Sequence, residues 1–167
     1  MTRADLLVLW EFNEWARERM LGAIRALTPE QFSRPLGSSF ASVRDTAVHL
    51  YSAEWVWYMR CHGESPTAPL AAEDFPDLPA IEAPWRDLAG KWRVFLGALD
   101  ADGHLRDVDY RQMNGQAFRS PVWHIVQHLV NHGTYHRGQV TTLLRQLGAT
   151  AAGTDLIAFH RERRMKA

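Results

Sequence analysis

The sequence predicts an all-α fold, a four-helix bundle with one long crossover and a small β-hairpin before its last helix. Four long segments repeat apolar residues at helical spacing. A proline-rich stretch of about twenty residues separates the second segment from the third, and an Asn-Gly turn precedes the fourth. The length of 167 residues suits one domain with its own core, so residues 1–167 are expected to form a single domain.

The first bundle helix is expected over residues 4–27. It stops at Thr28-Pro29, where threonine can cap and proline can begin a short following turn. Its apolar positions are Leu6, Leu9, Trp10, Ala16, Met20, Ile24 and Leu27. Ser42 and Asp45 form a capping-box pattern, with Asp in place of the usual Glu, and predict that the second helix runs from there to Cys61.

Residues 63–84 are expected to form a long irregular connection, because they contain five prolines together with small and acidic residues. Short loops join antiparallel neighbours in a bundle, whereas a link of this length can return the next helix parallel. Pro84 fits the first position of the third helix, which is expected to end at the Asp-Ala-Asp-Gly segment, residues 100–103.

A two-stranded hairpin is expected over residues 107–119, around Asn114-Gly115. Ser120-Pro121 is then expected to cap a fourth bundle helix over residues 121–147, closed by Gly148. A last short helix is expected over residues 154–164. It ends in several cations, which suit the C-terminus of a helix.

Composition excludes several kinds of partner. Acidic and basic residues balance at 19 each, so neither nucleic acid nor a membrane surface is expected as a partner. No segment approaches the roughly 20 apolar residues of a membrane span, and the first residues do not resemble a signal peptide. The single cysteine, Cys61, excludes an internal disulfide and fits a reducing compartment. We therefore expect a cytoplasmic protein.

Three histidines are the strongest functional signal in the chain. His132 and His136 lie one helical turn apart in the predicted fourth helix, and His49 lies in the second. Neutral imidazoles that point into an apolar interior are costly to leave unpaired, but they suit a divalent metal well. If the three side chains converge, they predict a metal site with an open coordination position.

The fourth helix carries four histidines at four-residue spacing, and periodicity separates them. His136 falls about 20° from the centre of the apolar stripe and His132 about 60° from it. His128 and His124 fall near 100° and 140° from it, because residues spaced by four drift about 40° around a helix. Only His136 and His132 are expected on the buried face. His128 and His124 are expected to face solvent or a partner surface.

The histidine pair has a second interpretation, in which both are core or boundary residues hydrogen-bonded to neighbours. His49 favours the metal interpretation, because it is expected among small and polar residues that leave room for a ligand. Two familiar sites are excluded. No glutamate follows His132 as in the His-Glu-x-x-His motif, and no Glu-x-x-His pair of a di-iron carboxylate bundle is present.

Four polar residues are candidates for the surroundings of this site. Asn13 lies on the apolar stripe of the first helix and Arg17 borders it, so each lines the metal cavity or pairs with backbone. Asp45 lies one turn before His49 and either orients its imidazole or serves the helix cap. Gln139 lies near the azimuth of His132 and either touches a bound ligand or sits at the bundle boundary.

With these residues, the sequence resembles the DinB/YfiT-like family of metalloenzymes over about residues 3 to 150. The most specific match is the second histidine followed by Arg-Gly-Gln. The matching segments are residues 12–16, 42–50, 114–115, 131–132 and 136–139. The resemblance implies an up-down-down-up bundle with a metal held by His49, His132 and His136. Many members have asparagine where this chain has Arg17.

The expected function follows from the charge of such a site. Three neutral imidazoles leave the metal's double charge uncompensated, so the open position favours hydroxide or a thiolate. The resemblance implies thiol transfer, since related members use bacillithiol, mycothiol or glutathione. We expect a metal-dependent thiol S-transferase, or a related hydrolase, acting on a small-molecule thiol and an electrophilic substrate. Zinc is the expected ion, with nickel, iron or manganese as alternatives.

The alternative is a non-catalytic metal-binding protein that serves as a stress-response or interaction module. No residue stands out as a general base, which weakens the hydrolase interpretation. A homodimer is expected from the family and from the abundance of tryptophan, which occurs seven times.

Overall fold

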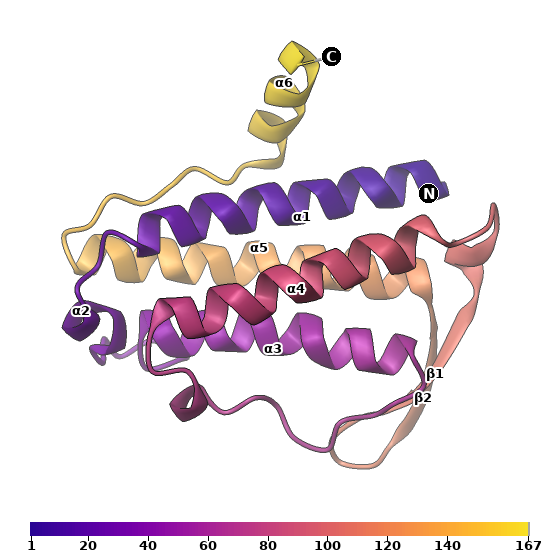
Figure 1. Cartoon of the computed structure of the whole chain (residues 1–167), viewed down its shortest axis with the longest axis horizontal. Helices are drawn as coiled ribbons and strands as arrows, with labels where there is room; N and C mark the ends of the chain where they lie inside the picture. Colours follow the sequence, from indigo (N-terminus) through magenta and orange to yellow (C-terminus); the bar gives the residue numbers. More distant parts are fainter. Residues whose placement is uncertain (167) are drawn as a thin grey trace.

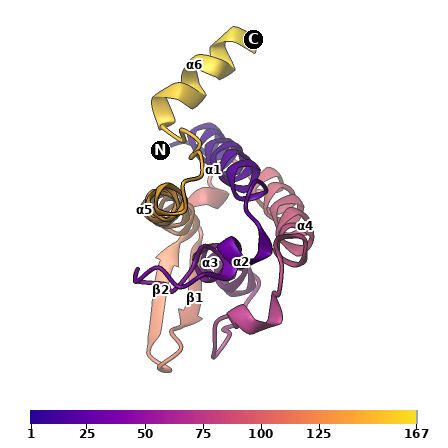
Figure 2. The same ribbon diagram turned by 90° about the vertical axis from the view of Figure 1, so that its left-hand side faces the viewer.

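The computed structural model describes residues 1–166 and has four long helices arranged as a bundle. They are α1 (Arg3–Ile24), α3 (Val43–Cys61), α4 (Leu78–Gly97) and α5 (Val122–Gln146). Both α1 and α3 pack against α4 and α5, which gives the square seen end-on in Figure 2. In Figure 1, α1 and α5 run one way and α3 and α4 the other. The predicted up-down-down-up bundle with its long crossover is confirmed.

The core lies where the apolar stripes of the four helices meet. Trp10 of α1 and Trp92 of α4 pack with ring centroids 5.0 Å apart, and both are almost completely buried, as is Trp85. Large buried aromatic side chains dominate the energetics of such a core. Within residues 1–166, no helix has both the length and the hydropathy needed to cross a bilayer.

The first half of the chain follows the predicted order, with small shifts at the ends. Helix α1 begins after a Thr2 cap and ends at Ile24, three residues before the expected end. Thr28 caps the short helix α2 (Pro29–Ser33), which confirms the predicted turn after Thr28-Pro29. Ser42 caps α3 by accepting from the Asp45 amide at 3.2 Å. The reciprocal half of the expected box is absent, because the Asp45 carboxylate lies on Arg44 Nε instead, at 3.2 Å.

The start of α4 corrects a prediction. The helix begins at Leu78, six residues before the expected start at Pro84, and ends at Gly97 rather than at residue 100. Asp77 provides the cap, since its carboxylate accepts from the Ala80 amide at 2.9 Å. Pro84 therefore lies inside the helix, where it lacks the amide hydrogen of a regular helix turn. Complete burial of Ile81 and Trp85 on either side of it favours the helical course in spite of that loss.

The predicted hairpin forms beside the C-terminal end of α3. Strands β1 (Asp107–Arg111) and β2 (Ala117–Pro121) pair antiparallel, with Val108 opposite Ser120. Gly115 adopts a φ of 85° in the turn, a conformation that favours glycine. Ser120-Pro121 does not cap α5 through a side chain as expected, because both residues complete β2.

The last helix, α6 (Leu156–Lys166), begins two residues after its expected start. It points away from the bundle beside α1, as both views show (Figures 1 and 2). Phe159 is its one buried residue within the described part of the chain, and that ring packs on Phe12 and Trp15.

Candidate metal centre

Three imidazoles from two helices converge at one point between α3 and α5. The Nε2 atom of His49 lies 3.0 Å from Nε2 of His132 and 3.1 Å from Nε2 of His136. One nitrogen of each ring lies within 4.8 Å of the other two. The structure thus brings together the three histidines singled out by sequence, although His49 lies 83 residues before His132 and 87 before His136.

The local helix geometry explains this convergence. His132 and His136 are one turn apart on α5, so their side chains project from the same side of the helix. His136 is buried and His132 is half-buried, whereas His128 and His124 are exposed. The order of burial along α5 is the one that the periodicity predicts. Packing of α3 against α5 then brings His49 opposite the pair.

Burial favours the neutral forms of His49 and His132 at neutral pH. It lowers the pKa of His49 to about 4, and the neighbouring His136 adds to the effect. Burial also lowers the pKa of His132 to about 3, again with a contribution from the other histidines. Neutral rings offer lone pairs, and lone pairs are what a metal ion binds.

The arrangement fits a cation better than hydrogen bonds alone. His136 Nδ1 lies 2.7 Å from Gln139 Oε1, an acceptor, so the ring carries its proton on Nδ1 and presents a lone pair at Nε2. His49 Nε2 faces the Nε2 atoms of both His132 and His136, but a neutral imidazole has at most one proton on Nε2 to donate. A divalent cation at the common point would satisfy all three nitrogens at once.

Gln139 also joins the cluster to the loop before α3. Its Nε2 atom donates to Ser39 Oγ at 3.3 Å, while its Oε1 atom receives the His136 proton. The loop is closed by a hydrogen bond from the Leu36 amide to the Ala41 carbonyl, at 2.8 Å. Gln139 is therefore fixed at both ends of its side-chain amide. Sequence alone left its role open between a ligand contact and a boundary position.

The same loop covers one side of the cluster with an aromatic ring. Phe40 stacks on His49 with centroids 4.2 Å apart, and its edge meets His136 at 5.5 Å. The ring restricts water on this side of the histidines. Sequence analysis missed Ser39 and Phe40, because an irregular loop has no periodicity from which a facing direction can be read.

Comparison with known proteins agrees with this fold. The model of the DinB family matches residues 1–165. The chain belongs to the DinB family. It is similar to Protein DinB from Bacillus subtilis (strain 168), with 27% identity over 154 residues and 88% of each chain covered.

Two solved structures resemble this DinB-family chain in fold. One is a DinB-like protein from Bacillus cereus, with a TM-score of 0.67, 23% identity, and 91% of this chain and 97% of that chain covered. The other is YfiT from Bacillus subtilis, with a TM-score of 0.63, 19% identity, and 87% and 86% covered. YfiT is described as a probable metal-dependent hydrolase with an unusual four-helix bundle topology.

The other predicted site residues of this DinB-family protein lie elsewhere. The Asp45 carboxylate contacts Arg44, and the first of its two predicted roles, a hydrogen bond to His49, is not found among the described residues. Asn13 donates to Glu54 Oε1 at 2.8 Å, and Arg17 lies 3.5 Å from Glu54 Oε2. Their partners are thus a buried carboxylate in the core, neither backbone nor the histidine cluster.

Glu54 is the centre of this second polar group, and sequence analysis missed it. Trp85 Nε1 also donates to Glu54 Oε2, at 2.7 Å. Glu54 lies four residues after Leu50 on the buried stripe of α3, so a charge on an apolar stripe was the available signal. The Arg137 guanidinium joins the group by donating to Asn13 Oδ1 at 3.0 Å.

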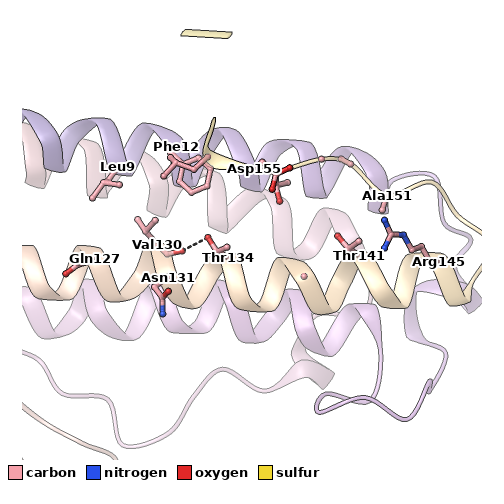
Figure 3. A pocket seen from close by; sticks show the side chains of 15 residues that line it. Leu9, Phe12, Gln127, Val130, Asn131, Thr134, Thr141, Arg145, Ala151 and Asp155 are labelled. Carbon is pink, nitrogen blue, oxygen red and sulfur yellow. Dashed lines mark hydrogen bonds between the residues drawn. The ribbon is translucent and has the colours of Figure 1, made fainter. Parts of the chain in front are cut away.

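A separate cavity of about 650 Å³ lies between α1, α5 and the segment before α6 (Figure 3). Leu9, Phe12 and Val130 form an apolar wall, and Thr134 and Thr141 add hydroxyl groups. None of the three clustered histidines lines it. Its position therefore does not connect it with the candidate metal centre.

Proposed function

We propose that this protein is a metal-dependent enzyme that transfers a small thiol to an electrophilic substrate. The observation that carries the proposal is the convergence of three Nε2 atoms from His49, His132 and His136 on one point. No carboxylate belongs to this cluster within residues 1–166. The description of YfiT as a probable metal-dependent hydrolase supports metal dependence in a protein of the same fold.

His49, His132 and His136 would hold the divalent ion, and imidazole ligands suit zinc, with nickel and iron as alternatives. Once bound, such an ion would act as a Lewis acid and would lower the pKa of a coordinated thiol or water. The three rings contribute no negative charge of their own. An anionic partner is therefore favoured over a neutral one, which supports a thiolate.

The protein's own residues position and shield this site. Gln139 fixes the protonated nitrogen of His136, so the other nitrogen stays available as a ligand. Phe40 covers His49 and limits competing water. In the overall reaction the thiol releases its proton to solvent and its sulfur bonds to the electrophilic carbon. The leaving group departs with the electrons of the bond that breaks.

Hydrolysis is the second candidate, and the description of YfiT favours it. A hydrolase ordinarily needs a general base that removes a proton from water during attack. The nearest acid along α3, Asp45, has its carboxylate engaged with Arg44. Thiol transfer depends less on such a base, because a thiol loses its proton far more readily than water. We therefore place thiol transfer first.

The test combines metal content with a conjugation assay. Wild-type protein is loaded with zinc and given glutathione and 1-chloro-2,4-dinitrobenzene, whose conjugation releases chloride. Stoichiometric zinc and metal-dependent conjugation are expected. His49→Ala should lose both, and His124→Ala, an exposed histidine on α5, should keep both.

Two other outcomes would contradict the proposal. Zinc that binds stoichiometrically, yet exchanges neither thiol nor water, would assign the site a structural role. Zinc that fails to bind the wild-type protein under any loading condition would remove the metal hypothesis altogether.

A further inference from the structure

Arg60 is a buried cation with no acidic partner in the described part of the chain. Its side chain lies near the C-terminal end of α3, and the residue is only 6% exposed. Its guanidinium carbon lies 4.6 Å from the ring centre of Trp57 and 5.0 Å from that of Tyr110. Nη2 donates to the Arg111 carbonyl at 3.2 Å, while Nε is buried without a hydrogen-bond partner.

The other buried arginines show what is missing at Arg60. Arg17 lies 3.5 Å from the Glu54 carboxylate. Arg137 has no carboxylate of residues 1–166 within ion-pair distance either, but its guanidinium donates to Asn13, which itself donates to Glu54, and to Thr134. For Arg60, no carboxylate of residues 1–166 lies within ion-pair distance. A buried charge without a counter-charge is costly, and folded proteins ordinarily pair it.

A structural role explains only part of this environment. Stacking on Trp57 and Tyr110 holds the hairpin against α3, and the bond to Arg111 adds to that attachment. Cation–π contact with the two rings offsets part of the cost of burying this charge. It supplies no counter-charge, and the Nε hydrogen is left without an acceptor, so the attachment of the hairpin compensates the guanidinium only in part.

A row of rings connects Arg60 with the histidine cluster. His132 and His128 lie 5.6 Å apart between ring centroids, and His128 and Trp57 lie 5.5 Å apart. Trp57 follows His49 by eight residues on α3, which is about 12 Å along a helix axis. Side chains tilt toward the N-terminus of their helix, so the guanidinium over Trp57 points back toward the cluster. Arg60 itself follows His49 by eleven residues, roughly 16 Å along the axis. The backward course of its side chain shortens the gap between the guanidinium and the clustered histidine nitrogens to between about 10 and 15 Å.

We infer that Arg60 binds the carboxylate of a small thiol whose sulfur reaches the histidine cluster. This inference rests on the proposed function, and it names the chemical class of the thiol. The linking part of the ligand lies along Trp57 and His128. The Tyr110 ring lies against the guanidinium and moves aside as the carboxylate enters. Arg60 then gains the counter-charge that the chain itself does not provide.

The test uses two thiols that differ only in the charge at the far end. Cobalt(II)-loaded protein is titrated with 6-mercaptohexanoate and with 6-mercaptohexanol, and binding is followed by the thiolate-to-cobalt absorption. Wild-type protein should bind the acid at least about tenfold more tightly than the alcohol, since a charge-assisted pair is worth at least that factor. Arg60→Gln should bind both thiols alike, and Arg60→Lys should keep part of the preference.

Arg111→Gln is the matched control. It removes one positive charge from the same hairpin, but at an exposed side chain. It should keep the full preference for the acid, which separates a specific pair from general attraction. Circular dichroism and urea unfolding establish that each variant is folded. Equal binding of acid and alcohol by wild-type protein, or an unchanged preference in Arg60→Gln, would overturn the inference.

Failure of the proposed function has a different signature, in which neither thiol produces the absorption. The carboxylate site is then measured in metal-free protein, by titrating hexanoate and hexanol against the indole resonance of Trp57. Binding of hexanoate that Arg60→Gln abolishes supports Arg60 as the anchor. Equal response to hexanoate and hexanol in this titration rejects it.

Discussion

Gln139 accepts a hydrogen bond from His136 Nδ1 at 2.7 Å and so determines which nitrogen of that ring faces the other two histidines. The same side chain donates to Ser39 in the loop that carries Phe40. The Gln139 side-chain amide therefore links the orientation of the His136 ring with the position of the loop that carries Phe40.

Replacing Gln139 should weaken metal binding without removing a ligand. In Gln139→Leu, His136 loses the acceptor that holds its proton on Nδ1, so we expect affinity to fall by about 10–100-fold. Competition with a chromophoric chelator measures the change. Gln127→Leu provides the control, because Gln127 is exposed on the same helix. Equal zinc affinity in the two variants would show that the hydrogen bond does not matter.

Removing the aromatic cover should change the rate of metal exchange more than the affinity. Phe40 stacks on His49 but supplies no ligand atom, so Phe40→Ala opens one side of the cluster and leaves three nitrogens in place. We expect several-fold faster extraction of zinc by excess chelator, followed by stopped-flow absorbance. Phe118→Ala, on the exposed side of the hairpin, should match wild type. An unchanged rate in Phe40→Ala would mean that access lies elsewhere.

The metal-free protein should lose stability as the pH falls below about 6.5, the ordinary histidine value. The pKa is about 4 for His49 and about 3 for His132 in the folded chain, each lowered from 6.5. In that range the unfolded chain binds protons that the folded chain does not, so stability is complete above 6.5 and declines toward the folded values.

Urea midpoints measured from neutral pH down to about pH 4.5 test this expectation. The double variant His49→Gln/His132→Gln should show a shallower decline than wild type, because it lacks both titrating rings. A decline of the same steepness in both proteins would assign the acid sensitivity to other groups.

Gly133 on α5 makes room for the buried polar group around Glu54. A Cβ added there would lie 2.6 Å from Arg137 Nη1 and 3.0 Å from Asn13 Oδ1. We expect Gly133→Ala to lower the free energy of unfolding by about 1–3 kcal/mol, the usual range for overpacking. Gly138→Ala, on the same helix with open space around it, should instead raise it by about 0.8 kcal/mol. Chemical denaturation of both variants measures the contrast, and a stabilised Gly133→Ala would contradict it.

Much of the bundle could be predicted from sequence because amphipathic periodicity carries most of the information. The four helices follow from it, and so does the burial of His136 and His132 relative to His128 and His124. The crossover and the hairpin follow from turn chemistry instead, the first from a proline-rich link and the second from Asn114-Gly115. Periodicity gives the direction of a side chain around its own helix. The packing of α3 on α5 then brings three such directions together.

The errors arose where local chemistry had more than one solution. Pro84 resembles a helix start, yet Asp77 provides a better cap six residues earlier and tertiary burial tolerates the proline. Asp45 had a choice of partners, and Arg44 was nearest along the chain. Asn13 and Arg17 needed partners that sequence did not name, because Glu54 lies about 40 residues away in another helix.

The terminal helix α6 is held to the rest of the protein by few interactions. Phe159 is its one buried residue in the described chain, and Glu162 accepts from Trp15 Nε1 at 2.9 Å. Two further ion pairs with α1, Arg19 with Glu162 and Arg163 with Glu11, lie near the surface, where such pairs add little stability. Segments with so little buried surface open independently of the main cooperative unit. Limited proteolysis would accordingly trim this arm first and leave a resistant fragment that still contains all three clustered imidazoles.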